Sequence, residues 1–172
     1  DNEGKKMSKS RGNVVNPWDH FNKEGTDAIR WYMTSQSAPW NPMNFDPNGV
    51  RETYAKMFLT LWNVHRFHLD YAILDNFDYS KDFIPVSKRS ALDRWILSRV
   101  SSVAENYHGQ YLTWEFHKAA RELENFVIND LSNWYVRRSR RRLWDEAESH
   151  DKRACQFTLH EILLTVSKLM AP

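Results

Sequence analysis

Apolar residues recur at intervals of three and four along four long stretches of the chain, the spacing of an α-helix with one buried face. The first stretch carries Val50, Tyr54, Met57, Leu61, Val64 and His68, and the second Leu92, Ile96, Val100, Val103 and Tyr107. The third carries Phe116, Ala120, Leu123, Val127, Leu131 and Trp134, and the fourth Cys155, Leu159, Ile162, Leu163, Val166, Leu169 and Met170. No strand-like alternation of comparable length accompanies them. The pattern predicts a mainly α protein, an antiparallel helical bundle with short connections.

Helix-start and helix-stop signals divide these stretches. Asp46, followed by proline, opens the first helix, which we expect to run to about Leu74 before a loop over residues 75–86. Ser90 is the expected N-cap of the second helix, and Gly109 its expected end. Thr113 is the expected N-cap of the third helix.

Shorter helices precede the bundle. Asn16 and Pro17 are typical of a helix start, and we expect a short helix from there that stops at Gly25. Thr26 is the expected cap of a second helix, whose buried side would hold Ala28, Ile29, Tyr32 and Met33.

Prolines interrupt residues 38–44, which the sequence predicts to be a linker. We place a domain boundary there. Residues 1–44 would form one part of the molecule, and residues 45–172 the helical bundle.

Composition narrows the class of protein. The chain has 172 residues, of which 41% are hydrophobic and 27% charged, as in a folded globular protein. It has one Cys, which excludes an internal disulfide and a Cys-based zinc site and fits a reducing compartment. There is no apolar run of the length that a membrane span needs. His65 and His68 are three apart but lack a matching carboxylate pair, so we interpret them as core or surface residues and expect no metal site.

A cationic loop lies near the start of the chain. Lys6 and Lys9 alternate with Ser8 and Ser10 around Met7, with glycines on both sides. Each ammonium is a compact charge that can meet a polyphosphate, and the hydroxyls can add hydrogen bonds. No nucleophile is paired with a base here, so catalysis would be electrostatic stabilisation of a charged transition state. A solvated loop is the alternative interpretation of the pentapeptide alone.

A run of arginines from residue 137 to 142 is the second informative stretch. At 100° per residue, Arg138 and Arg141 continue the apolar face of the preceding helix. The helix would therefore kink near residues 132–133, or its end would project beyond the bundle and meet an anionic surface. Arginine forks suit phosphates and base edges, and Trp134 and Tyr135 could stack on unpaired bases.

An ion-pair lattice is the alternative for this run. Arg141 and Asp145, and Arg142 and Glu146, have the i,i+4 spacing of helical ion pairs, worth a few tenths of a kcal/mol each. These acids would satisfy two arginines and leave three. The residues alone leave RNA binding and a solvated face equally open.

The segments from Gly4 to Pro17 and from Gly25 to Tyr32 resemble the KMSKS region of class I aminoacyl-tRNA synthetases. In that family the loop closes over ATP while the amino acid is activated. The resemblance implies that residues 6–10 bind ATP together with its Mg²⁺. It further implies that Lys6 and Lys9 neutralise the departing pyrophosphate, with Lys9 the stronger candidate for direct contact.

Two later segments narrow the resemblance. Residues 92–99 are similar to the start of the anticodon-binding bundle in the isoleucyl, valyl and leucyl group, and residues 130–142 are most similar to the isoleucyl-tRNA synthetases. This implies a monomeric, cytoplasmic enzyme acting on isoleucine, ATP and tRNA(Ile). The tRNA-binding residues would be Trp134, Tyr135, Arg137, Arg138 and Arg141.

The remainder of such an enzyme is not in this sequence. The nucleotide-binding fold with its HIGH motif is missing, so we interpret the chain as an excised fragment that is inactive alone. A valyl enzyme is a close alternative, and a helical RNA-binding module without catalysis is an alternative of another class.

Overall fold

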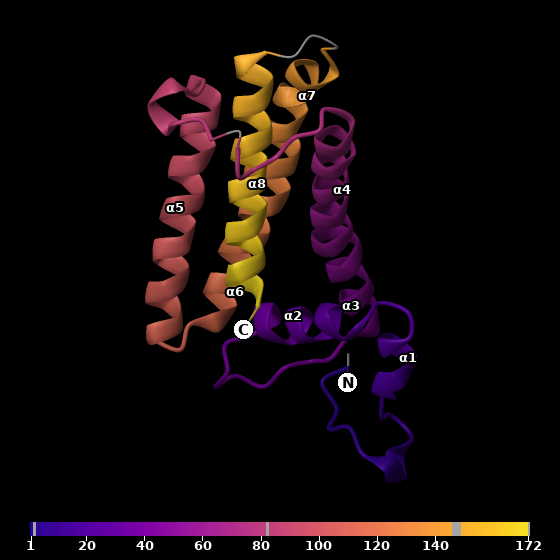
Figure 1. The fold of residues 1–172 in the computed structure, drawn as a ribbon. Coiled ribbons are helices and arrows are strands. Elements are labelled where there is room, and N and C mark those ends of the chain that lie inside the picture. Colours follow the sequence, from indigo (N-terminus) through magenta and orange to yellow (C-terminus); the bar gives the residue numbers. More distant parts are fainter. Residues whose placement is uncertain (2, 82, 146–148, 172) are drawn as a thin grey trace.

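The computed structural model describes residues 1, 3–81, 83–145 and 149–171, which are mainly helical and contain no strand. Figure 1 shows four long helical segments side by side, running alternately up and down. A further helix lies across their lower end, and the N-terminal segment hangs below it. The predicted antiparallel bundle is confirmed.

The bundle is built from helices. Its members are α3 (Pro47–Thr53), η2 (Tyr54–Phe58), α4 (Leu59–Leu74), α5 (Ala91–Leu112), α6 (Phe116–Asn125), η4 (Phe126–Val136), α7 (Arg137–Trp144) and α8 (His150–Met170). Before them come η1 (Lys9–Arg11), α1 (Pro17–Phe21) and α2 (Thr26–Gln36), and η3 (Val86–Lys88) precedes α5. Three of these run on without a break as α3–η2–α4, and three more as α6–η4–α7. The longest connection of the bundle, residues 75–90, lies between α4 and α5.

The first bundle helix begins and ends as the sequence predicts. Asp46 accepts a hydrogen bond from the backbone N–H of Asn48 at 2.9 Å, and Pro47 occupies the first helical position, where no N–H is needed. Six positions of the predicted apolar face are buried or half-buried: Val50, Tyr54, Met57, Leu61, Val64 and His68. Burial, together with the neighbouring His160 and His65, lowers the pKa of His68 to about 4, so its imidazole is neutral at pH 7.

The second bundle helix begins at the predicted cap but ends later than predicted. Ser90 and Asp93 form a reciprocal capping box. Gly109 lies inside the helix, because a glycine within a helix costs only about 1 kcal/mol. Thr113 is the C-cap of α5, where its hydroxyl donates to the carbonyls of Gly109 and Gln110, so the predicted N-cap role is wrong. Glu115 occupies the N-cap position of α6 instead.

The N-terminal helices also differ in detail from the prediction. Gly25 is the N-cap of α2, with a φ of 85° that favours glycine, so Thr26 is the first helical residue and not the cap. Met33 is 52% exposed, whereas Trp31 is 8% exposed and packs into the bundle core. The buried side of α2 is therefore rotated toward Trp31.

The η4 segment is π-helical, with hydrogen bonds from residue i to i+5, and this determines which residues of the α6–η4–α7 helix face the core. A row of residues at every fourth position is 0–1% exposed: Val127, Leu131, Tyr135, Ser139 and Leu143. In an α-helix such positions would drift by about 40° at each step. The wider turns of η4 hold more residues each and offset that drift. Trp134 is 47% exposed, so its predicted place on the apolar stripe is wrong.

Helix α2 joins two hydrophobic clusters. Ala28, Ile29 and Tyr32 pack with Val50 in a small cluster near the N-terminal segment. Trp31, on another face of α2, belongs to the core of the bundle. The chain on either side of residues 38–44 is thus in contact, and the predicted domain boundary there stays a prediction.

Gly49 offers a test of this packing. A Cβ added there would lie 2.4 Å from the Tyr32 ring, which is 3% exposed and holds the backbone N–H of Asp46 through its hydroxyl at 3.0 Å. In Gly49→Ala, we expect the clash with the ring to cost about 1–3 kcal/mol of stability. The better helix propensity of Ala offsets about 1 kcal/mol of that cost. The measurement is the free energy of unfolding in urea.

Gly109→Ala is the matched control. Nothing lies within 4 Å of a Cβ added there, so only helix propensity acts, and we expect a gain of up to about 1 kcal/mol. Equal effects of the two substitutions would show that the Tyr32 ring does not resist the added methyl group.

Candidate nucleotide loop and nucleic-acid interface

The cationic loop presents its lysines to solvent. Lys9 begins the short helix η1, which ends at Gly12 with a φ of 68°. Lys6, Met7, Lys9 and Ser10 are exposed, and Ser8 is half-buried. Within the described part of the chain, Lys6 and Lys9 form no ion pair, in contrast to Lys5, which pairs with Glu3 at 2.7 Å. Two ammonium groups are therefore available to an anion.

Asn13 holds this loop together. Its Oδ1 accepts a hydrogen bond from the backbone N–H of Ser8 at 2.9 Å, and its Nδ2 donates to the carbonyl of Lys6 at 3.3 Å. Nδ2 also donates to the carboxylate of Asp1 at 2.8 Å. The backbone on both sides of Met7 is thus tied to one side chain, which leaves the lysine side chains unconstrained.

The arginine run presents one charged face outward. Arg137, Arg138, Arg140 and Arg141 are exposed, and none forms an ion pair with another described residue. The guanidinium of Arg138 lies over the Trp134 ring, 4.0 Å from its centroid. Such a cation–π pair holds the guanidinium and the indole together, and Trp134 is still 47% exposed.

Arg142 points the other way, into the bundle. Its Nη1 and Nη2 donate to the two carboxylate oxygens of Asp93 at 2.8 and 2.7 Å. Its Nε also donates to Asp151 at 2.7 Å. Although burial alone would lower the pKa of Arg142, these bonds raise it, so the guanidinium stays charged.

Asp93 is the buried centre of a polar network. Its side chain has no exposed surface, and it also accepts hydrogen bonds from Tyr135 at 2.5 Å and Ser90 at 2.8 Å. Burial alone would raise its pKa, but the bonds from Arg142, Tyr135 and Ser90 together lower it. The carboxylate therefore contributes stability above about pH 4, the value for an unfolded chain, and loses it as the pH falls through the folded-state pKa.

This network corrects two predictions. Tyr135 is 0% exposed, so it cannot stack on a base as predicted and instead donates its hydroxyl to Asp93. The predicted pair between Arg141 and Asp145 is not formed, and the pair between Arg142 and Glu146 involves a residue outside the described ranges. The acids that satisfy Arg142 come from α5 and α8, which local spacing cannot reveal.

The sequence reasoning missed two members of the outward face. Arg140 is exposed beside the other arginines, and Trp144 is 57% exposed at the end of α7. Trp144 follows Arg140 and Arg141 by four and three residues, so helical spacing from the arginines was the signal that could have found it. We call the exposed side chains of Trp134, Arg137, Arg138, Arg140, Arg141 and Trp144 the arginine face.

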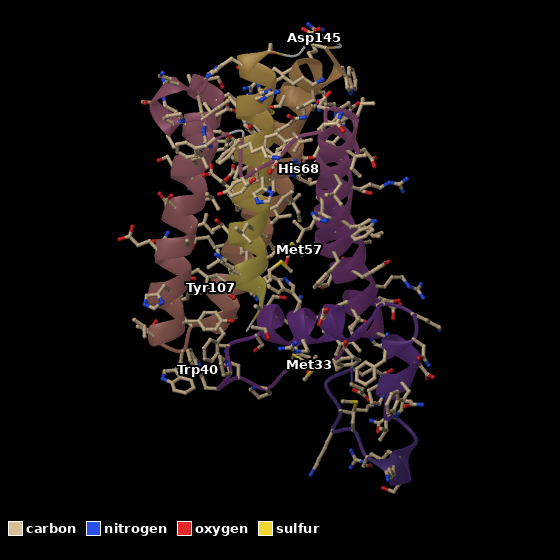
Figure 2. All side chains as sticks on the ribbon, in the orientation of Figure 1. Met33, Trp40, Met57, His68, Tyr107 and Asp145 are labelled. Atoms are coloured by element: carbon tan, nitrogen blue, oxygen red, sulfur yellow. The ribbon has the colours of Figure 1, made fainter. Side chains whose placement is uncertain are left out.

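The loop and the arginine face lie at opposite ends of the molecule. Figure 1 shows α7 at the upper end of the bundle and the N-terminal segment below its lower end. In Figure 2, Asp145 at the end of α7 is likewise far from Met33 and Trp40. The molecule therefore displays two separate cationic regions, each a candidate for binding an anion.

Two other chemistries find no support in the described residues. They contain no group of three or more His, Cys, Asp or Glu side chains that could hold a metal ion. None of their helices is long and apolar enough to cross a bilayer.

Two family models match the chain. One covers the cationic loop, and the other covers the arginine face. Residues 1–46 match the model described as tRNA synthetases class I (I, L, M and V). Residues 93–172 match the anticodon-binding domain of tRNA ligase. The chain belongs to the class I tRNA synthetases.

Curated relatives extend the match over the whole chain. All 172 residues align with the isoleucine–tRNA ligases of Porphyromonas gingivalis and Thermus thermophilus, each at 45% identity, and of Cytophaga hutchinsonii at 44%. The chain spans 15% of the first ligase and 16% of the other two. The segment therefore corresponds to a small part of each of these ligases.

A solved structure shares the fold. The agnB2 LeuRS of Agrobacterium radiobacter K84, determined as a ternary complex with tRNA and LeuAMS, superposes on 99% of this chain with a TM-score of 0.67. The match takes in 20% of that chain at 18% identity, so it supports the arrangement of helices alone.

The contrast between adjacent arginines of this synthetase segment is testable. We expect Arg142→Met to cost about 3–5 kcal/mol of stability, because it leaves the Asp93 carboxylate buried without its charged partner. Arg141→Met, the matched control one residue away, should change stability by less than about 0.5 kcal/mol. Urea unfolding at pH 7 measures both, and equal losses would contradict the inward placement of Arg142.

Proposed function

We propose that this chain is part of an isoleucine–tRNA ligase, an enzyme that activates isoleucine with ATP and transfers it to tRNA(Ile). The observation that carries the proposal is the identity of 45% to isoleucine–tRNA ligases over the whole chain. The two cationic regions give the proposal its chemistry. One would serve ATP and the other tRNA.

Lys6 and Lys9 would act on the phosphates of ATP. Amino-acid activation releases pyrophosphate, so negative charge grows on the leaving oxygens in the transition state. An ammonium placed against those oxygens stabilises the transition state more than the ground state, which raises the rate and not only the binding. Met7, Ser8 and Ser10 would contact ATP as part of the same loop.

Mg²⁺ would arrive with ATP. The ammonium groups and hydroxyls of the loop suit phosphate oxygens. The ammonium groups repel a divalent cation, and the loop has no carboxylate to bind one. Mg²⁺ in nucleotide sites is commonly held through the substrate phosphates. This segment would therefore contribute no metal ligand of its own.

The arginine face would contact tRNA. Guanidinium groups bind phosphates in a forked geometry, and the exposed faces of Trp134 and Trp144 are suited to stacking on unpaired bases. Arg137, Arg138 and Arg141 would make the phosphate contacts, with Arg140 at their edge. The enzyme would be cytoplasmic and monomeric.

Pyrophosphate exchange by the complete protein that contains this segment tests the proposal. We expect isoleucine to stimulate exchange more than valine. Exchange that depends on valine would move the chain to the valyl enzymes. Absence of amino-acid-dependent exchange, with tRNA binding retained, would support a non-catalytic RNA-binding module.

Lys9→Ala in the complete enzyme tests the loop. We expect kcat for isoleucine activation to fall on the order of a hundredfold or more, with tRNA affinity nearly unchanged, because one charge stabiliser of the transition state is lost. Lys23→Ala is the control, since Lys23 is exposed in the turn after α1. A wild-type activation rate in Lys9→Ala would show that the loop is a solvated surface segment without a catalytic role.

Replacement of Arg137, Arg138 and Arg141 together by Gln tests the arginine face. Gln has nearly the helix propensity of Arg, so α7 should persist. Each lost phosphate contact should flatten the slope of log affinity for tRNA against log salt by roughly 0.7–0.9. A loss of affinity without a change of slope, together with relaxed discrimination between tRNAs, would instead indicate base contacts.

The control for this variant removes the same charge elsewhere. Arg30, Arg51 and Arg66 are exposed on α2, α3 and α4 and are not part of the arginine face. We expect their joint replacement by Gln to leave the salt slope unchanged. Wild-type affinity and slope in the α7 variant would remove the arginine face from the tRNA interface.

A further inference from the structure

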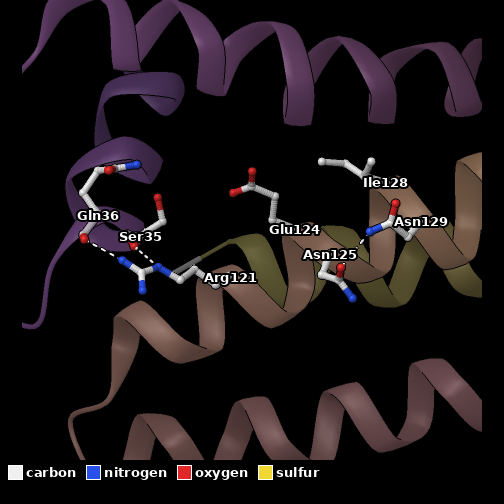
Figure 3. A pocket seen from close by; sticks show the side chains of 7 residues that line it. All are labelled: Ser35, Gln36, Arg121, Glu124, Asn125, Ile128 and Asn129. Atoms are coloured by element: carbon white, nitrogen blue, oxygen red, sulfur yellow. Dashed lines mark hydrogen bonds between the residues drawn. The ribbon is translucent and has the colours of Figure 1, made fainter.

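A joint between α2 and α6 connects the two cationic regions. Arg121 of α6 donates from Nε to the carbonyl of Ser35 and from Nη2 to the carbonyl of Gln36, each at 2.6 Å. Figure 3 shows this fork beside a pocket of about 380 Å³ between the helices, with Glu124 facing into the same space. Glu124 accepts a hydrogen bond from the indole of Trp31 at 3.4 Å.

The end of α2 depends on this fork. The last carbonyls of a helix lack partners within the helix, and the last turn of α2 contains no basic residue. Ser37, its C-cap, is extended and does not continue the hydrogen-bond ladder. Arg121 therefore supplies two donors and a positive charge at the negative end of the helix dipole.

The first part of α2 packs against α1, the helix that follows the nucleotide loop in the chain. Ala28, Ile29 and Tyr32 pack with Phe21 of α1 and with Val50, and α1 follows directly from the loop. Toward the other region, Arg121 lies in the unbroken α6–η4–α7 helix, which ends in the arginine face. By helix geometry, the 16 residues from Arg121 to Arg137 span roughly 20–25 Å.

We propose that Arg121 is a positioning residue for amino-acid activation: its fork on the α2 carbonyls fixes the nucleotide loop relative to the tRNA-binding bundle. This rests on the proposed function. The guanidinium is exposed, so water replaces its hydrogen bonds when it is removed, and its effect on stability should be small. Its effect on geometry is direct, because the two bonds define both the position and the direction of the α2 end.

Single-turnover formation of isoleucyl-adenylate by the complete enzyme tests this role. We expect Arg121→Ala to lower the rate constant roughly 10–100-fold, as misplacement of reacting groups by about 1 Å can do. The amplitude of adenylate formation, the Kd for tRNA and the Tm should stay near the wild-type values. A structural role alone would lower the amplitude and the Tm and leave the rate constant unchanged.

Glu122→Ala is the matched control. Glu122 is the next residue of α6, but it accepts its hydrogen bonds from Asn106 and Gln110 of α5, at 2.9 and 3.1 Å. We expect its rate constant to equal that of the wild type.

The outcomes separate this inference from the function on which it rests. No adenylate formation by the wild-type enzyme would overturn the proposed function. An active wild type with an unchanged rate constant in Arg121→Ala would overturn the positioning role alone. A fall in rate that Glu122→Ala reproduces would also overturn it, because the joint with α2 would then have no special part.

Discussion

The buried carboxylate of Asp93 sets the arrangement on which the arginine face depends. It receives hydrogen bonds from α5, from η4 and from α7, and Arg142 carries the connection on to Asp151 of α8. A buried charge is costly unless hydrogen bonds and an opposite charge compensate it. The network therefore favours the one rotation of α7 about its axis that directs Arg142 to Asp93. With Arg142 directed inward, Arg137, Arg138, Arg140 and Arg141 face solvent. The electrostatics of the exterior are thus fixed from the interior.

The fold presents the charges of the two cationic regions in different ways. The lysines of the loop stand on a backbone that Asn13 holds through its bonds to residues 6 and 8. The arginine face stands on one continuous helix, which fixes the spacing of its side chains. Helix α2 and the fork of Arg121 connect the two without requiring either to change its local structure.

Much of this molecule could be predicted from the sequence because its signals are local. Ser90, Asp46 and the apolar spacing of α4, α5 and α8 each act within a few turns of one helix, and all are confirmed. The class of synthetase was also evident from the residues around Lys9 and Trp134, and the relatives confirm it. The predictions that failed in the arginine run needed distant partners. Tyr135 is buried by Asp93, 42 residues away in the sequence, and no spacing rule connects them.

The wide turns of η4 have a consequence for how this segment tolerates changes of length. Hydrogen bonds from i to i+5 take up extra residues without breaking the helix, so a deletion within Phe126–Val136 could be absorbed as ordinary α-helix with every backbone group still paired. A wide turn that becomes an α-helical turn loses its extra residue and keeps the direction of the helix beyond it, so Arg142 would still meet Asp93. The α-helix of Arg137–Trp144 has no wide turn to convert, so a deletion before Arg142 within it would turn the residues beyond through about 100°. A different side chain would then meet Asp93, and the charged surface would face a different side of the bundle.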